Sequence, residues 1–375
     1  MHIRARIYRK IKEKADRVSV FSFRKEKKYM SLYLNYEPEV LVSTEGLTNE
    51  HWLEYRRLGI GGSDAAAVMG LSPFCTIRDL YYDKCGIQEI MDEEESNWVA
   101  KKVGHRLEDL VAEIFSVKTG LRVYPVRKMF RHTLFPFMLA DVDFFIDFGN
   151  GRTGILECKT TNYNCQNKWA NDSVPVNYEY QGRHYMAVMN LDEVYFACLY
   201  GNNENEFIIR HMERDLDIEE DLIAEEANFW NEYVQKKIEP PYIEKPDLVL
   251  ESIRKHYGPA EKDSDTVILS PTHLKSVKKY LSCKGQKAEA EKEVKRLDEE
   301  MKQSYLDIVE ELGPNCTGKI SSGNKEYMIS YNPMYRVSID KKALERLKIQ
   351  RPDIYDDYVS VSESRRFSVK IKEAA

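Results

Sequence analysis

Glu157 and Lys159 stand two residues apart in a short, otherwise apolar segment, GILECKTT at 154–161. Side chains alternate between the faces of a strand, so Glu157 and Lys159 would share one face and Cys158 would lie on the other. For an isolated pattern of this kind, an ion pair on an edge strand is the ordinary explanation. Further acids brought to the same face would favour catalysis instead.

Two such acids lie upstream, in PFMLADVDFFID at 136–147. Read as one strand, this segment carries Asp141 and Asp143 on one face. Its apolar face would consist of Met138, Ala140, Val142, Phe144 and Ile146. The following DFGNGRTG predicts a turn, so adjacent antiparallel strands would bring Asp143 beside Glu157. For each aspartate alone, exposure to solvent is the simpler explanation.

Converging carboxylates repel each other unless a proton or a cation lies between them. Oxygen ligands with room for water suit Mg²⁺, and Mn²⁺ can take the same ligands. Lys159 has only hydrogen-bond donors and cannot bind a metal ion, but it can orient the attacking water and favour its deprotonation. The pattern D-(x)13-E-x-K, from Asp143 to Lys159, therefore predicts a metal-dependent phosphodiesterase.

A further acid comes from the helical pattern GHRLEDLVAEIFSVKTG at 104–120. Glu108 lies at the margin of the apolar stripe, from which a carboxylate can reach a site beside the core. Asp109 and Glu113 fall on the solvent side. The stripe consists of Leu107, Leu110, Val111, Ile114 and Phe115. Alone, Glu108 would be an ordinary boundary glutamate.

Gln181 and Tyr185 form another polar pair, in the helical pattern YEYQGRHYMAVM at 178–189. Being four residues apart, they share one face of a helix. In isolation, a simple Gln–Tyr contact on a helix surface explains the pair equally well.

The order of G-H-R-L-E, L-A-D-V-D, L-E-C-K-T-T and Q-x-x-x-Y resembles the YqaJ-type phage recombinase family. That family is related to lambda exonuclease within the PD-(D/E)xK nucleases. The resemblance runs from about His51 to Arg214. It implies a mixed α/β fold, with a central sheet flanked by helices in the manner of restriction endonucleases.

The resemblance also assigns roles. It implies that the metal site consists of Glu108, Asp143, Glu157 and the carbonyl of Cys158. Lys159 becomes the catalytic lysine, and Gln181 and Tyr185 match a motif that supports the active site near DNA. The family often has Gly after the motif aspartate, where Phe144 stands here, so the choice between Asp141 and Asp143 as ligand stays open.

The Gly-rich segment RRLGIGGSDAAAVMGLSPF at 56–74 lacks the patterns of nucleotide phosphate loops. It predicts a loop entering a helix that is capped by Ser63 or Asp64. By resemblance, Arg57 and Ser63 match an arginine and a serine that hold the terminal 5′-phosphate of DNA. An ordinary helix cap is the alternative for Ser63.

Composition sets the broad class. The chain of 375 residues is 42% hydrophobic and 31% charged, as in soluble globular proteins, and no apolar run approaches a membrane span. Seven scattered cysteines without a C-x-x-C pair argue against a zinc ribbon or an iron–sulfur cluster and favour reduced thiols in the cytoplasm. The net charge of −6 permits a local basic groove for nucleic acid.

Three regions are expected. Residues 1–42 are a basic leader and lead-in, in which Met30 could be the natural start. Residues 43–250 are the nuclease domain. Residues 251–375 form an accessory region with a long helical segment at 272–312 and short strands, including a hairpin around Ser322-Gly323-Asn324.

The resulting hypothesis is a Mg²⁺-dependent deoxyribonuclease, a 5′→3′ exonuclease acting on double-stranded DNA ends. The resemblance adds a phage or prophage origin in a bacterial host cell, a homo-oligomer with the form of a ring, and a single-strand annealing protein as partner. Two alternatives stay open: an endonuclease with the same core, and a non-catalytic DNA-binding or assembly protein. No membrane association is expected.

Overall fold

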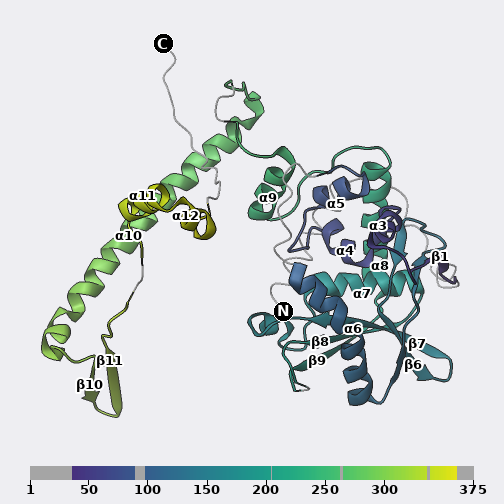
Figure 1. Cartoon of the computed structure of the whole chain (residues 1–375), viewed down its shortest axis with the longest axis horizontal. Coiled ribbons are helices and arrows are strands. Elements are labelled where there is room, and N and C mark those ends of the chain that lie inside the picture. The colour runs from purple at the N-terminus through teal and green to yellow at the C-terminus, as the bar shows by residue number, and fades with distance from the viewer. Residues whose placement is uncertain (1–35, 89–97, 204, 262–264, 336–337, 361–375) are drawn as a thin grey trace. The chain divides into compact units, whose positions relative to one another are not determined.

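The computed structural model describes residues 36–88, 98–203, 205–261, 265–335 and 338–360 (Figure 1). The chain divides into two compact units, 1–258 and 259–375. The predicted boundary at residue 250 falls inside α9 (Pro246–Tyr257), where Ser252 is buried and donates to Asp79 at 2.5 Å. Helix α9 therefore belongs to the first unit. Most of the predicted leader, with Met30, lies outside the described residues.

A five-stranded mixed sheet forms the centre of the first unit, in the order β3-β6-β7-β8-β9. Its strands are β3 (Arg122–Tyr124), β6 (Phe144–Gly149), β7 (Arg152–Thr160), β8 (Glu193–Leu199) and β9 (Phe207–Glu213). Strands β6 and β7 are antiparallel, as predicted, whereas β7 and β8 are parallel. The fold is thus mixed α/β, as expected.

Helices cover both faces of this sheet (Figure 1). The buried side of α6 (Trp98–Thr119) packs on Leu156 and Cys158, and α7 (Val176–Met189) packs on the opposite face around Ile155. Leu110, placed in the predicted stripe of α6, is 42% exposed. Short apolar runs on alternating sides of β7 thus anchor one helix on each face.

A second sheet has the order β1-β4-β5-β2, with strands β1 (Glu39–Ser43), β4 (Lys128–Arg131), β5 (Met138–Ala140) and β2 (Ile60–Gly61). The prediction of one continuous strand through 136–147 is wrong, because β5 pairs with β2 and β4 while β6 joins the central sheet. The connecting residues 141–143 leave strand geometry as the chain passes between sheets. The predicted boundary at residues 42 and 43 falls inside β1.

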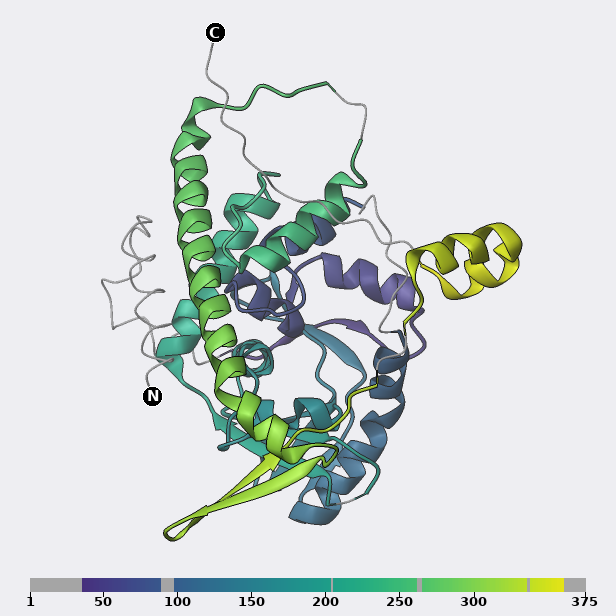
Figure 2. The same cartoon turned by 90° about the vertical axis from the view of Figure 1, so that its left-hand side faces the viewer.

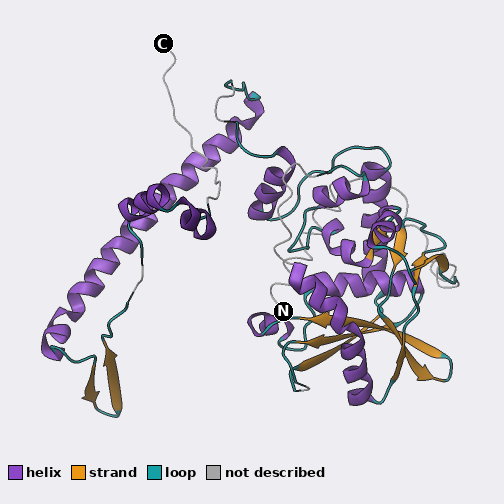
Figure 3. Cartoon of the chain, viewed as in Figure 1, coloured by secondary structure: helices purple, strands orange, loops and turns teal. Residues whose placement is uncertain are grey.

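The described part of the first unit contains six further helical segments (Figure 3). They are α3 (Asn49–Arg57), α4 (Gly62–Val68), α5 (Ile77–Lys84), η2 (Tyr163–Trp169), α8 (Leu216–Asn228) and η3 (Phe229–Val234). Gly61, rather than Ser63 or Asp64, is the N-cap residue of α4, and the Asp64 carboxylate accepts from the Gly61 N–H at 2.9 Å.

The second unit contains η4 (Pro271–His273), α10 (Leu274–Leu312), β10 (Thr317–Ser322), β11 (Lys325–Ser330), α11 (Lys341–Gln350) and α12 (Pro352–Tyr358). The predicted long helix and the hairpin with Gly323 in its turn are confirmed. The hairpin lies at the end of α10 (Figure 2), where Gly318 packs on Leu312. No helix in the described ranges has the length and apolar content needed to cross a membrane.

Candidate active site

Glu157 is the most enclosed of the predicted acids, at 2% exposure. Its Oε1 accepts hydrogen bonds from Lys159 Nζ and Gln181 Nε2, both at 2.5 Å. Among the described residues, Glu157 Oε2 is buried and has no hydrogen-bond partner. The alternation of β7 therefore places Glu157 and Lys159 on the α7 face, while the Cys158 side chain is buried on the α6 face.

Asp143 immediately precedes β6, and its Oδ2 accepts the N–H of Cys158 at 2.8 Å. This bond fixes the carboxylate against β7, on the strand that carries Glu157. Asp141 points elsewhere, because its Oδ2 accepts from Trp52 Nε1 of α3 at 2.7 Å. Of the two aspartates, Asp143 is the one held at β7, the strand that carries Glu157 and Lys159.

Glu108 approaches this group from α6 and keeps 35% of its side chain exposed, while Asp109 and Glu113 are exposed. Its Oε1 lies 3.0 Å from His105 Nδ1. Burial, and then the charge of Asp143, raise the pKa of Glu108. The predicted marginal position on the helix thus leaves this carboxylate within electrostatic reach of the other two.

The electrostatics of the site favour a cation or a proton. Burial, and then the neighbouring Asp143 carboxylate, raise the pKa of Glu157 to about 8. Burial likewise raises the pKa of Asp143, against the opposing charge of Lys159. Burial alone would lower the pKa of Lys159, but the Glu157 and Asp143 carboxylates raise it further than burial lowers it. Lys159 therefore stays an ammonium group.

The predicted side-chain ligands Glu108, Asp143 and Glu157 all offer carboxylate oxygens, which are the ligands that hard cations such as Mg²⁺ prefer. The unpartnered Oε2 of Glu157 is a buried acceptor that such a cation would satisfy. In the described part of the chain, no three or more His, Cys, Asp or Glu side chains are gathered closely enough to hold a metal ion as they stand. The acids thus supply suitable ligands without a closed coordination shell.

Helix α7 connects the acids to the beginning of α4. Gln181 Nε2 donates to Tyr185 Oη at 3.4 Å as well as to Glu157. The Tyr185 ring lies against Gly62, where an added Cβ would come within 2.4 Å of it. Gly62 therefore allows the backbone beside Ser63 to approach α7 closely.

Arg57, which the resemblance assigns with Ser63 to the 5′-phosphate, does not lie beside Ser63. Arg57 Nε instead lies 3.3 Å from Asp83 at the surface, and Arg56 Nη2 lies 2.7 Å from both Ser63 Oγ and Asp64 Oδ1. Successive residues of a helix point about 100° apart, so only one of two adjacent arginines can face α4.

The environment of Ser63 is positively charged. Asp64 is paired with both Arg56 and the fully buried ammonium of Lys84, at 2.7 Å each. Burial would raise the pKa of Asp64, but the two cations hold it well below its usual range. Lys84 also lies 3.6 Å from Asp83, which pairs with Arg57, so this cluster of ion pairs contains three cations and two carboxylates and carries a net positive charge beside Ser63.

Sequence reasoning missed His184, which is fully buried between the two predicted residues of α7. Its Nε2 donates to the Leu139 carbonyl and its Nδ1 contacts Glu226, both at 2.8 Å. No local pattern indicated the pairing with Glu226, because the two residues lie on different helices. Trp52 and Arg56 were missed for the same reason.

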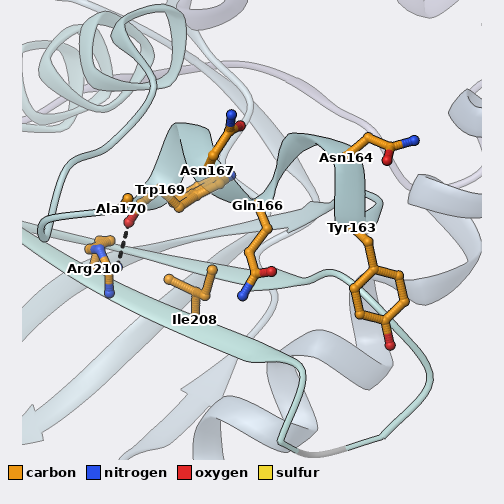
Figure 4. Close-up of a pocket in the computed structure, with 8 residues that line it drawn as sticks. All are labelled: Tyr163, Asn164, Gln166, Asn167, Trp169, Ala170, Ile208 and Arg210. Atoms are coloured by element: carbon orange, nitrogen blue, oxygen red, sulfur yellow. Dashed lines mark hydrogen bonds between the residues drawn. The ribbon is translucent and has the colours of Figure 1, made fainter. Parts of the chain in front are cut away.

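A separate cavity of about 440 Å³ lies between η2 and β9 (Figure 4). It is lined by Tyr163, Asn164, Gln166, Asn167, Trp169, Ala170, Ile208 and Arg210. The Arg210 guanidinium donates to the Trp169 carbonyl at 2.6 Å, which fixes η2 against the sheet. None of the predicted site residues lines this cavity.

The chain is similar in sequence to a known domain family and to a known bacterial protein. Residues 51–192 match the YqaJ-like viral recombinase domain. The chain is 32% identical over 334 residues to the uncharacterized protein YqaJ of Bacillus subtilis strain 168, covering 88% of this chain and 97% of that protein.

Two solved structures are also similar. One is an alkaline exonuclease (LHK-Exo) from Laribacter hongkongensis, with 19% identity, a TM-score of 0.42, and coverage of 51% of this chain and 95% of that one. The other is a phage related exonuclease from Haemophilus somnus 129PT, with 14% identity, a TM-score of 0.36, and coverage of 50% and 97%.

Proposed function

Because the chain belongs to the YqaJ family of viral recombinase domains, we propose that it is a metal-dependent deoxyribonuclease. Its reaction is 5′→3′ digestion of duplex DNA ends, which exposes a single strand for recombination by annealing. The observation that carries the proposal is the convergence of Asp143, Glu157 and Lys159, with Glu157 also held by Gln181. A pure DNA-binding protein gains nothing from carboxylates gathered opposite phosphates.

The strand order at the site supports a PD-(D/E)xK core. The first acid precedes β6, and the E-x-K pair follows on the antiparallel strand β7. Both lie in a mixed sheet between helices α6 and α7. This is the arrangement that the sequence motif D-(x)13-E-x-K requires.

Glu108, Asp143, Glu157 and the Cys158 carbonyl would hold Mg²⁺, or Mn²⁺ in its place, and such an ion offsets negative charge on the phosphoryl group under attack. Lys159 donates hydrogen bonds to the attacking water and stabilises the hydroxide that forms from it. Its high pKa favours this donor role over that of a base. Gln181 fixes the Glu157 carboxylate, and the Tyr178 ring lies 4.7 Å from the Lys159 ammonium and limits its movement.

Arg56 and Ser63 would receive the terminal 5′-phosphate. A guanidinium and a hydroxyl 2.7 Å apart, in a positively charged environment, can bind two oxygens of such a group. The contact between Gly62 and Tyr185 brings this pair next to α7, the helix that carries Gln181. Arg57, assigned this role from the sequence, is replaced by Arg56 in the proposal because its side chain lies toward Asp83.

The test is digestion of end-labelled linear duplex DNA in Mg²⁺, with a covalently closed circle and excess chelator as controls. We expect the linear duplex to lose nucleotides from its 5′ ends and the circle to stay intact. Cleavage of the circle would favour the endonuclease. Undiminished digestion in chelator would refute the metal mechanism, and digestion from 3′ ends would refute the polarity.

The family setting suggests two further associations. We propose that the first unit assembles into a ring that encloses DNA, and that a single-strand annealing protein receives the exposed strand. These proposals rest on the family resemblance and place the protein in the cytoplasm of a bacterial host that carries a phage or prophage.

A further inference from the structure

Helix α10 is long, and most of its side chains are exposed. It spans Leu274–Leu312, 39 residues, which corresponds to about 58 Å. Every residue from 282 to 307 is exposed. Isolated helices are only marginally stable in water, and most helices gain their stability by packing an apolar face. A helix of this length therefore implies a partner along its side.

An apolar stripe on α10 provides a face for that partner. Val294, Leu297, Met301 and Tyr305 follow one another at spacings of three and four residues, and their exposures are 58%, 45%, 64% and 39%. Such spacing places the side chains on one narrow side of the helix, as in a coiled-coil seam. Charged residues border the stripe on both sides.

Charge is distributed unevenly along the helix. Residues 274–288 contain five lysines and no acid, a net charge of +5. Residues 289–311 contain nine acids and four basic residues, a net charge of −5. Arg296 is paired with Glu293 and Glu300 on its own helix, whereas Lys279 and Lys284 make no ion pair within the described residues.

We propose that α10 pairs with α10 of a second copy of this chain, in antiparallel orientation. The apolar stripes form the seam, and the basic beginning of each helix lies along the acidic end of the other, which carries Asp307, Glu310 and Glu311. A parallel pair would place lysines against lysines and acids against acids, which is unfavourable. The antiparallel pair has two-fold symmetry, so each copy presents the same surface to the other.

The heptad pattern suggests the alignment. With Val294 of one copy against Leu297 of the other, Met301 lies against Ala290 and Cys283 lies against Ile308. The two Cys283 thiols are then separated by roughly 37 Å along the seam. In a parallel pair they would lie side by side.

Charge reversal in the full-length protein tests the pairing. Variant one carries Lys278→Glu, Lys279→Glu and Lys284→Glu. Variant two carries Asp307→Lys, Glu310→Lys and Glu311→Lys. All six positions are on the solvent-facing surface or at its margin, so both variants should keep the helix content of the wild type by circular dichroism.

We expect each variant alone to self-associate on the order of ten- to a hundredfold more weakly, measured by sedimentation across a concentration series. An equimolar mixture of the two should regain association. Any assembly through the first unit is common to all samples and cancels in the comparison. Equal masses for wild type and both variants, or no recovery on mixing, would overturn the proposal.

Cysteine cross-linking tests the orientation. In a Cys316→Ser background, a short bismaleimide should leave Cys283 unlinked to its counterpart, and the further change Ile308→Cys should give dimers joined between positions 283 and 308. Mass spectrometry of the linked peptides identifies the pair. Dimers joined through two Cys283 residues would refute the antiparallel orientation. Neither test measures DNA digestion, so the outcome is independent of the proposed nuclease function.

Discussion

Arg56 and Arg57 are neighbours on α3, and only Arg56 faces Ser63, so the two form a matched pair for testing how a DNA end is sensed. The Arg56 guanidinium lies 2.7 Å from both Ser63 and Asp64. Arg56→Ala removes this guanidinium but leaves Asp64 paired with Lys84. The substitution therefore removes the proposed phosphate contact without leaving a buried carboxylate unpaired.

The magnitude follows from the type of contact. A hydrogen bond to a charged group contributes about 1.5–3 kcal/mol, which corresponds to roughly 10- to 150-fold in rate. We expect Arg56→Ala to slow digestion of 5′-phosphorylated ends by that factor relative to 5′-hydroxyl ends. Arg57→Ala should leave the ratio nearly unchanged, because its exposed ion pair with Asp83 contributes only about 0–1 kcal/mol.

The assay is single-turnover digestion of two duplexes that differ only in the presence of the 5′-phosphate. The ratio of the two rates is the readout, so a loss of stability common to both reactions cancels. An unchanged ratio in Arg56→Ala would refute this arginine as the phosphate ligand. If Arg57→Ala changed the ratio more than Arg56→Ala does, the arginine that contacts the phosphate would be Arg57, and α3 would have different contacts when DNA is bound.

Four further outcomes are expected. Glu157→Gln should abolish digestion of end-labelled DNA yet keep the fold by circular dichroism, because the amide oxygen can still accept from the neighbouring lysine. Lys159→Ala removes a hydrogen-bond donor to the attacking water but no metal ligand, because an ammonium group cannot ligate a metal ion. The variant should therefore lose turnover while retaining metal binding, and DNA binding in a gel-shift assay. Burial lowers the pKa of His132 to about 4. Below pH 6.5 this histidine therefore binds a proton in the unfolded chain but stays neutral in the native state. The free energy of unfolding in urea should therefore fall by at most about 3 kcal/mol from pH 6.5 to 4, and less in His132→Asn. Truncation after Gly258 should leave metal-dependent cleavage of short DNA, since every proposed site residue lies in the first unit; a folded but inactive fragment would contradict this.

Local periodicity made strand β7 and its alternation predictable. The alternation in residues 154–161 and the Gly-rich turn before it were enough to place Glu157 and Lys159 on one face, opposite an antiparallel strand. The same alternation led to the wrong prediction of one continuous strand through 136–147. The apolar spacing continues through Asp141 and Asp143, although the chain passes from one sheet to another there. Periodicity reports which side is buried, but not which strand is the neighbour.

Contacts between distant elements could not be read from the sequence. Whether Arg56 or Arg57 faces Ser63 depends on the rotation of α3 about its axis, which is set by packing that includes the bond from Trp52 to Asp141. His184 and Glu226 are both buried and contact each other from different helices. Neither residue stands in a local pattern that distinguishes it from a surface residue.

Helix α7 explains why these separate parts can act as one site. Three of its side chains, within about one and a half turns, reach three different elements. Gln181 donates to Glu157 on β7, and His184 donates to the Leu139 carbonyl on β5, the strand that leads to Asp143. Tyr185 packs on Gly62 at the start of α4, next to the proposed phosphate site.

All three contacts are buried. The two hydrogen bonds tolerate little displacement because an unpaired buried group is costly, and the close packing of Tyr185 on Gly62 leaves no room for one. A shift of α7 would therefore disturb Glu157, the segment before Asp143 and the environment of Ser63 together. Recognition of a 5′-phosphate and hydrolysis of the adjoining bond require a fixed spacing between the two sites. Under the proposed function, the attachment of both sites to one helix supplies that spacing, which neither β7 nor the arginine pair could set alone.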